Sequence, residues 1–322
     1  MTMTDHRRRR IPAPIPSQSP TQKLQTTFAA VRVSFTWLGV RKTLTQTQKA
    51  QAAEPFGAEE KYLSAAKKLL DTSHPLFKDV TSIRNRVLAH WKAMTLPYPE
   101  PGVRLIKQSD VQTFDDDLRG LKEELTAAVG LLDAQYDTLK QAARDRLGSL
   151  YSDLDYPPTL VGLFDVSWEF PSVAPPEYLL RLNPQLYQQE QQRITARFDE
   201  AVRLAESAFT EEFAKLVSHL TERISGNGPD GKKVFRDGVI DNLQDFFARF
   251  KSLNVGSNQQ LDELVETAQR AVKGIAPQDL RDSEAVRQQV TTQLAAVTAT
   301  LDAMLVDAPR RRILRPLPAQ VA

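Results

Sequence analysis

The chain has 322 residues, of which 41% are apolar and 25% charged, a composition typical of a folded soluble protein and unlike that of a disordered one. It contains no cysteine, which excludes disulfides, thiolate zinc sites and cysteine nucleophiles. We find no run of about 18 uncharged apolar residues and no apolar stretch after the arginines at 7–10. The sequence therefore predicts a cytoplasmic protein with no membrane partner.

The net charge of +2 is distributed unevenly along the chain. Residues 1–22 carry four arginines and one aspartate, and residues 308–322 carry four arginines and no acidic residue. The segment between them has 34 basic and 39 acidic residues, a net charge of about −5. A basic body would have indicated a nucleic-acid groove. Here only the two ends are basic.

Proline placement divides the chain, because proline interrupts helix interiors. We expect a disordered basic, Pro-rich leader at 1–22 and an elongated helical domain with a small sheet at 23–225. Helical hairpins at 226–307 are expected to pack on that domain, followed by a disordered basic tail at 308–322.

Alternating apolar and polar residues predict strands at 31–37, 166–170 and 178–182, which could pair in one small sheet. Helices are expected at about 58–70 and from Pro75 to Trp91, followed by a Pro-rich connection at 94–108. Shorter helices are expected near the C-terminus, at 234–253, 258–273 and 284–306.

Two long helices are predicted at 109–147 and 184–224, where proline is absent after Pro184 and apolar residues recur every eleven positions. Ser109 and Gln112 match a capping box at the start of the first. Eleven residues over three turns is close to a straight helix, and each helix would span about 55–60 Å. The predicted fold is thus mainly α: an elongated antiparallel bundle built on two long helices, with a small β element at one end. The stripes would pack against each other or, alternatively, form a self-association seam as in a coiled coil.

The motifs that suggest catalysis lack their required context. Gly226–Lys232 fits a phosphate-binding loop, but it follows a helix, contains Pro229 and lacks the magnesium-binding Ser or Thr. Ser64 and Lys67 match S-x-x-K without its partner motifs. The four histidines are scattered, and the three aspartates at 115–117 suit a helix N-terminus. We therefore expect no enzyme activity, no metal and no cofactor.

Arg84, Asn85, Arg86 and Trp91 are the candidate partner-binding residues, since they place two guanidiniums and an indole on one helix. The simpler interpretation is that they brace the following connection against the long helices.

These residues also belong to a set of short motifs: Arg84-Asn85, Trp91, Thr95–Tyr98, Gly102–Leu105, Leu147-Gly148 and Asp155–Pro157. Through these motifs, residues 30–225 resemble an uncharacterised, mostly helical domain-of-unknown-function family of bacteria and their phages. Members are often encoded beside MoxR-type AAA+ ATPases and von Willebrand A proteins. The resemblance implies an accessory component of an ATPase-driven remodelling system and carries no catalytic residues.

Two functions follow as hypotheses. The first is a non-catalytic helical adaptor or accessory subunit that binds a AAA+ ATPase or a von Willebrand A protein. The alternative is a phage- or nucleoid-associated protein that binds nucleic acid weakly and without sequence preference. Its candidate residues are the terminal arginines, namely Arg7, Arg8, Arg9, Arg10, Arg310, Arg311, Arg312 and Arg315.

Overall fold

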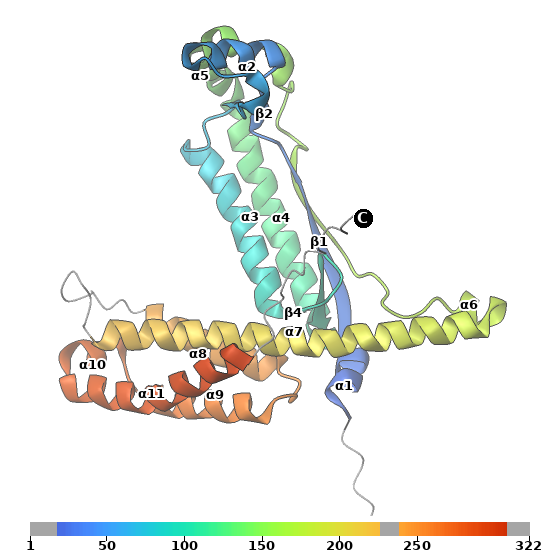
Figure 1. Cartoon of the computed structure of the whole chain (residues 1–322), viewed down its shortest axis with the longest axis vertical. Coiled ribbons are helices and arrows are strands. Elements are labelled where there is room, and N and C mark those ends of the chain that lie inside the picture. Colours follow the sequence, from blue (N-terminus) through green and yellow to red (C-terminus); the bar gives the residue numbers. More distant parts are fainter. Residues whose placement is uncertain (1–17, 226–237, 308–322) are drawn as a thin grey trace, which may run out of the picture.

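The computed structural model describes residues 18–225 and 238–307, which form an upright arm standing on a crossbar (Figure 1). The upright contains α3 (Pro75–Met94), α4 (Val111–Ala134) and the strands beside them. The crossbar is α7 (Pro184–Ser225) with α8 (Gly238–Leu253), α9 (Gln259–Val272), α10 (Pro277–Asp282) and α11 (Glu284–Asp307). Among the described helices, none is both long and apolar enough to cross a bilayer.

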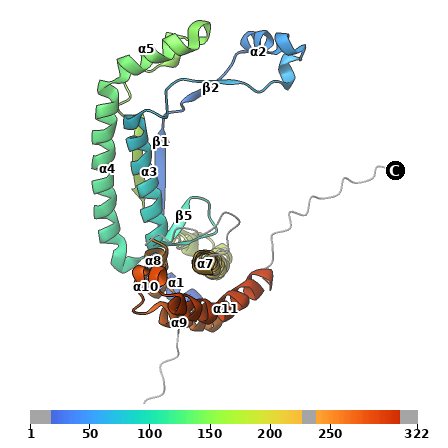
Figure 2. The same cartoon turned by 90° about the vertical axis from the view of Figure 1, so that its left-hand side faces the viewer.

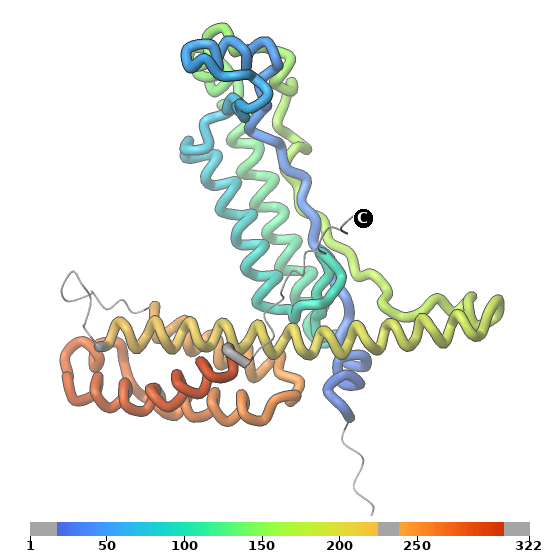
Figure 3. Tube along the Cα trace, in the orientation of Figure 1, coloured from blue at the N-terminus to red at the C-terminus, as the bar shows by residue number. Residues whose placement is uncertain are grey.

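The chain passes along the upright four times before it enters the crossbar (Figure 3). After α1 (Pro20–Thr27) it rises through β1 (Phe28–Trp37) and descends through α3. It turns through β4 (Thr95–Pro97) and β5 (Val103–Lys107), rises through α4 and descends through β6 (Phe164–Glu169). Figure 2 shows β1, α3 and α4 side by side, with α7 seen end-on below them.

The far end of the upright, which we call the tip, comprises residues 41–70 and 136–160. Its elements are β2 (Arg41–Thr43), α2 (Gln46–Ala53), β3 (Ala66–Lys68) and α5 (Tyr136–Leu147). Four short 3-10 turns also lie there: Glu54–Phe56, Glu60–Tyr62, Gly148–Leu150 and Asp153–Asp155. Strands β2 and β3 pair with each other as a separate two-stranded sheet.

The main sheet has four antiparallel strands in the order β4-β5-β1-β6. The first half of β1 pairs with β5, Phe28 lying opposite Lys107, and its second half pairs with β6, Trp37 lying opposite Phe164. The strands predicted at 31–37 and 166–170 are therefore confirmed and are neighbours.

Two separate hydrophobic cores meet at this sheet, because successive side chains of a strand point to opposite faces. Val31 and Val33 belong to the core of the upright, with Phe114, Leu118 and other side chains of α3 and α4. Ala30 belongs to the core of the crossbar, which is built from α7, α8, α9 and α11. The sheet thus joins the two parts of the molecule.

The predicted fold class, an elongated antiparallel bundle on two long helices with a small β element at one end, is wrong. The protein is mostly helical, but it has eleven described helices, a four-stranded sheet and a two-stranded sheet. The two long stripes do not pack on each other. The stripe of α4 is buried against α3 and the sheet, and that of α7 against α8, α9 and α11.

The first long helix is also interrupted. Helix α4 ends at Ala134, and α5 begins at Tyr136 after Gln135 leaves the helical conformation with φ −101° and ψ 6°. A 3-10 turn at Gln108–Asp110 replaces the predicted capping box, and the Ser109 hydroxyl donates a hydrogen bond to Asp110 instead. The apolar stripe from Phe114 to Leu139 is nevertheless buried as predicted.

Other local predictions were wrong where tertiary partners override the local pattern. Residues 58–70 form a 3-10 turn and β3 rather than a helix. The segment predicted as a strand at 178–182 is helix α6 (Tyr178–Leu182). The connection at 94–108 contains β4 and β5, and the predicted leader ends earlier, because Ser19 caps α1. The helices predicted from Pro75 and at 184–224, 258–273 and 284–306 are confirmed.

The turn between β4 and β5 gives a first stability prediction. Gly102 has φ +78°, a left-handed conformation that costs other residues about 1–2 kcal/mol, and no other group lies near its missing side chain. We expect Gly102→Ala to destabilise the protein by about 1 kcal/mol in chemical denaturation. As a control, Gly130→Ala, at an exposed position inside α4, should be neutral or slightly stabilising. Equal effects would show that the conformation of Gly102 is not the cause.

Candidate functional site

The candidate site is a cavity of about 760 Å³ between the end of β1 and the first turns of α3, which we call the Arg84 pocket. Because Pro75 starts α3 directly after the tip, the N-terminal turns of the helix stand opposite the segment that leaves β1. The pocket is lined by twelve residues, among them the sequence-predicted Arg84 and Asn85. Trp37, Arg41 and Lys78 also line it.

Arg84 is held in place by aromatic rings rather than by an acid. The central carbon of its guanidinium lies 4.8 Å from the ring centroid of Trp37 and 5.3 Å from that of Phe35. Its Nε is buried and has no hydrogen-bond partner in the described part of the chain, where no carboxylate pairs with it either. An oriented guanidinium without a counterion is therefore available at this pocket.

The surroundings of the pocket are positive. Arg41 from β2 and Lys78 from α3 add two exposed cations to Arg84, and none of the twelve lining residues carries a carboxylate. Helix α3 has no acidic residue in its first turn, so the positive end of its dipole is not compensated there. Such a site favours an anionic group.

Arg86 lies outside this pocket. Its guanidinium makes a two-pronged contact with the carboxylate of Glu124 on α4, one of the two hydrogen bonds measuring 3.1 Å. This pairing raises the pKa of Arg86 and lowers that of Glu124. Because both side chains are half exposed, water screens the ion pair and it adds little to stability. Arg86 braces α3 against α4.

Trp91 is also outside the pocket, and it faces Arg104 of β5, whose guanidinium carbon is 6.0 Å from a Trp91 ring centroid. Arg104 donates hydrogen bonds of 2.6 and 2.9 Å to the hydroxyl and carbonyl of Thr95. Burial, with repulsion from Arg249, lowers the pKa of Arg104 to about 10. The four residues predicted to bind a partner therefore have two different roles. Arg84 and Asn85 line a pocket, whereas Arg86 and Trp91 contact neighbouring elements and hold α3 in place.

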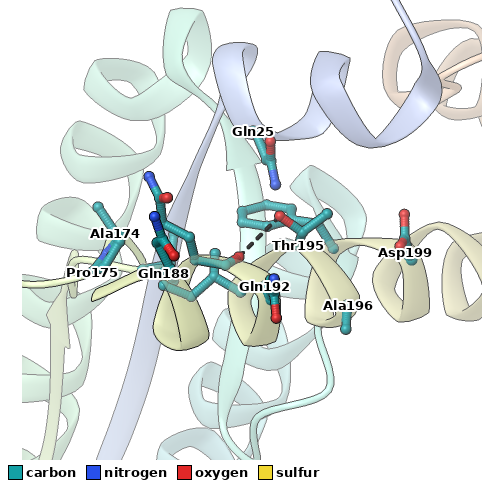
Figure 4. Close-up of a pocket in the computed structure, with 12 residues that line it drawn as sticks. Gln25, Ala174, Pro175, Gln188, Gln192, Thr195, Ala196 and Asp199 are labelled. Carbon is teal, nitrogen blue, oxygen red and sulfur yellow. Dashed lines mark hydrogen bonds between the residues drawn. The ribbon is translucent and has the colours of Figure 1, made fainter. Parts of the chain in front are cut away.

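A second hollow of about 760 Å³ lies on the crossbar, where α1 and residues 173–175 meet α7 (Figure 4). Its lining is half apolar and half polar, and the one charged residue among the lining residues is Asp199, which accepts a 2.5 Å hydrogen bond from Thr21. Figure 4 shows Gln25 of α1 facing Thr195 of α7. Thr195 itself donates to the carbonyl of Gln191.

The free end of the crossbar beside this hollow exposes several large apolar side chains. Helix α6 and the start of α7 form a projecting hairpin (Figure 1), which exposes 76% of Leu182 and 61% of Tyr178. Leu180 and Leu186 are also exposed there. Sequence reasoning missed this surface because the alternation of Tyr178, Leu180 and Leu182 was interpreted as a half-buried strand.

The remaining motifs have structural partners or fall outside the described residues. Lys67 of the S-x-x-K match is in β3, not on a helix, and its amine is 2.5 Å from a carboxylate oxygen of Asp155. His90 stacks on Phe114, and Asp115 accepts a hydrogen bond from Trp168. No metal-binding group of residues occurs in the described ranges. Gly226–Lys232 and all eight terminal arginines lie outside them.

No protein-family model, curated protein or solved structure matches this chain. The family resemblance inferred from the short motifs therefore stays a prediction.

Proposed function

We propose that the protein is a non-catalytic helical adaptor that works in the cytoplasm by binding a protein partner. The observation that carries this proposal is the projecting α6–α7 hairpin, which presents Tyr178, Leu180, Leu182 and Leu186 to solvent on one arm of a two-armed molecule. These large apolar side chains are exposed within nine residues of one hairpin, and such surfaces are candidates for protein binding. The second arm carries the Arg84 pocket, so one molecule offers two separate contact regions.

The proposed partner is a AAA+ ATPase or a von Willebrand A protein, as the family resemblance implies. Binding of nucleic acid through the terminal arginines is the second candidate, and it is supported by their clustering at the two ends of an acidic body.

Leu182→Asp is the test of the hairpin. We expect the variant to bind the proposed AAA+ ATPase or von Willebrand A partner at least about tenfold more weakly, because a charge replaces an apolar side chain at the centre of the proposed contact. Titration calorimetry with the purified partner measures the loss. Leu182 is largely exposed, so folding should be preserved, as circular dichroism can check.

The matched control is Leu154→Asp, the same substitution at the tip, where Leu154 is 95% exposed. We expect it to leave partner binding unchanged. If Leu154→Asp removes binding and Leu182→Asp does not, the partner docks on the tip. If neither partner binds the unaltered protein, the adaptor proposal is wrong.

A further inference from the structure

We infer that the Arg84 pocket binds an acidic peptide segment of the partner, with its carboxylates on the pocket cations and an apolar side chain against the aromatic wall. This inference rests on the proposed adaptor function and specifies the chemistry of one of its contacts.

The carboxylate preference follows from the placement of the three cations. Arg84 is oriented by Trp37 and Phe35, so its planar donors are already fixed for a two-pronged contact with a carboxylate. Arg41 comes from β2 and Lys78 from the first turns of α3, so the cations approach the pocket from different elements. In the described part of the chain none of the three forms an ion pair, and a ligand carboxylate would supply the missing charge.

The rest of the lining favours a peptide over a small inorganic anion. Trp37, Leu38, Val40 and Phe77 provide apolar surface, which a free phosphate would leave uncovered. Hydroxyl groups of the lining and the Asn85 amide can bond to a peptide backbone. The volume of about 760 Å³ is within the range of ligand sites that enclose several groups at once.

The same geometry disfavours a nucleic-acid backbone. A duplex presents a continuous row of phosphates and is bound by a row of cations along its length. Arg41, Lys78 and Arg84 instead converge on one cavity, and the body between the basic ends is acidic overall. A short acidic segment that ends in, or bends into, the pocket is the better match.

The inference is tested by fluorescence anisotropy with the full chain and a fluorescein-labelled peptide in which glutamate alternates with leucine. We expect saturable binding that weakens as salt is added. Lys78→Gln and Arg84→Gln should each weaken it about tenfold or more, since each removes a charge-assisted hydrogen bond. Lys92→Gln is the matched control, because Lys92 is exposed on the same helix and does not line the pocket, and it should have no effect.

Arg84→Gln could weaken binding indirectly, by disturbing the rings of Trp37 and Phe35 that it contacts. Lys78→Gln does not have this difficulty, because the Lys78 side chain is exposed and makes no described hydrogen bond. The inference is overturned if the same peptide with glutamine in place of glutamate binds equally well, or if Lys92→Gln weakens binding as much as Lys78→Gln. It is also overturned if inorganic phosphate or duplex DNA displaces the peptide more effectively than unlabelled peptide does.

The two proposals fail in different ways. Loss of the peptide site with intact Leu182-dependent partner binding would remove the inference and keep the adaptor. A working peptide site in a protein that binds no ATPase or von Willebrand A partner would remove the proposed adaptor function and keep the pocket.

Discussion

Asp155→Asn is expected to destabilise the tip by about 3–5 kcal/mol, the usual cost of leaving one charge of a buried pair without its partner. The Asp155 side chain is 4% exposed, and its two oxygens lie 2.5 Å from the amines of Lys42 and Lys67. The Lys67 side chain is buried as well, and its amine also donates to the carbonyl of Leu150. Without the carboxylate charge, the buried Lys67 amine would keep the Leu150 carbonyl as an acceptor but would lose its counterion.

The register of β2 and β3 gives the Asp155 carboxylate a second role, in the pairing of these two strands. Lys42 of β2 and Lys67 of β3 lie directly opposite each other, and like charges in that position destabilise an antiparallel pair. Asp155 neutralises both and so permits the two strands to pair. Because Arg41 precedes Lys42 on β2, the same substitution should also displace one cation of the Arg84 pocket.

Amide hydrogen exchange measures this effect, because it reports opening of the tip separately from the crossbar. We expect faster exchange in β2 and β3 of Asp155→Asn, with α8 and α9 unchanged. Asp153→Asn is the control, since Asp153 is exposed and its side chain contacts Arg144 and Tyr151 at the surface of the described part of the chain. Equal exchange in the two variants would contradict the role assigned to Asp155.

A pH dependence follows from the same contacts. Hydrogen bonds from Lys42 and Lys67 lower the pKa of Asp155 below its usual value. A carboxyl group with a lowered pKa stabilises the folded state above its unfolded pKa of about 4, and this contribution is lost as the pH falls through the lowered value. Protection factors of the tip amides, which correct for the intrinsic pH dependence of exchange, should therefore fall in the unaltered protein only below about pH 4, and Asp155→Asn should lack this fall.

How much the sequence predicts depends on whether a pattern is local. Helix α7 was predicted almost to its ends because a long stretch without proline or glycine carries an apolar stripe. The stripe shows that one face is buried, but it contains no information on which element covers it. The bundle prediction paired the two longest stripes, whereas each is covered by shorter helices that follow or precede it in the chain.

The helix predicted at 58–70 was wrong for a related reason. The segment Ser64–Leu70 has helix-forming residues, but Lys67 lies in β3 and pairs with the carboxylate of Asp155, 88 positions away. No local pattern in the sequence indicates such a distant partner. Likewise, the candidate site was only half predictable. Arg84 and Asn85 share one helix, whereas Trp37 and Arg41 reach the same pocket from β1 and β2 through tertiary folding.

The largest expected effect concerns the terminal arginines, where the two candidate functions differ most. If they bind nucleic acid, affinity must come from neutralising phosphates, because no groove-reading motif accompanies them. Up to eight contacts give a slope of up to roughly −7 in a plot of log affinity against log salt, a loss of about 10³–10⁵ between 50 and 200 mM salt. Removing residues 1–17 and 308–322 should then abolish binding, since the remaining body has a charge of about −5.

The structure fixes where that truncation must stop. Ser19 caps α1, Leu24 is fully buried, and Thr21 bonds to Asp199 of α7, so a deletion extending to residue 22 would damage the crossbar itself. A chain that begins at residue 18 keeps all three of these contacts, so we expect it to fold, and gel-shift and partner-binding assays can then be compared directly. The adaptor hypothesis expects the truncated chain to keep its ATPase or von Willebrand A partner, because docking uses the α6–α7 hairpin and the Arg84 pocket. Partner binding that disappears with the ends, from a chain that still shows native circular dichroism, would place the contact on the terminal segments and overturn that assignment.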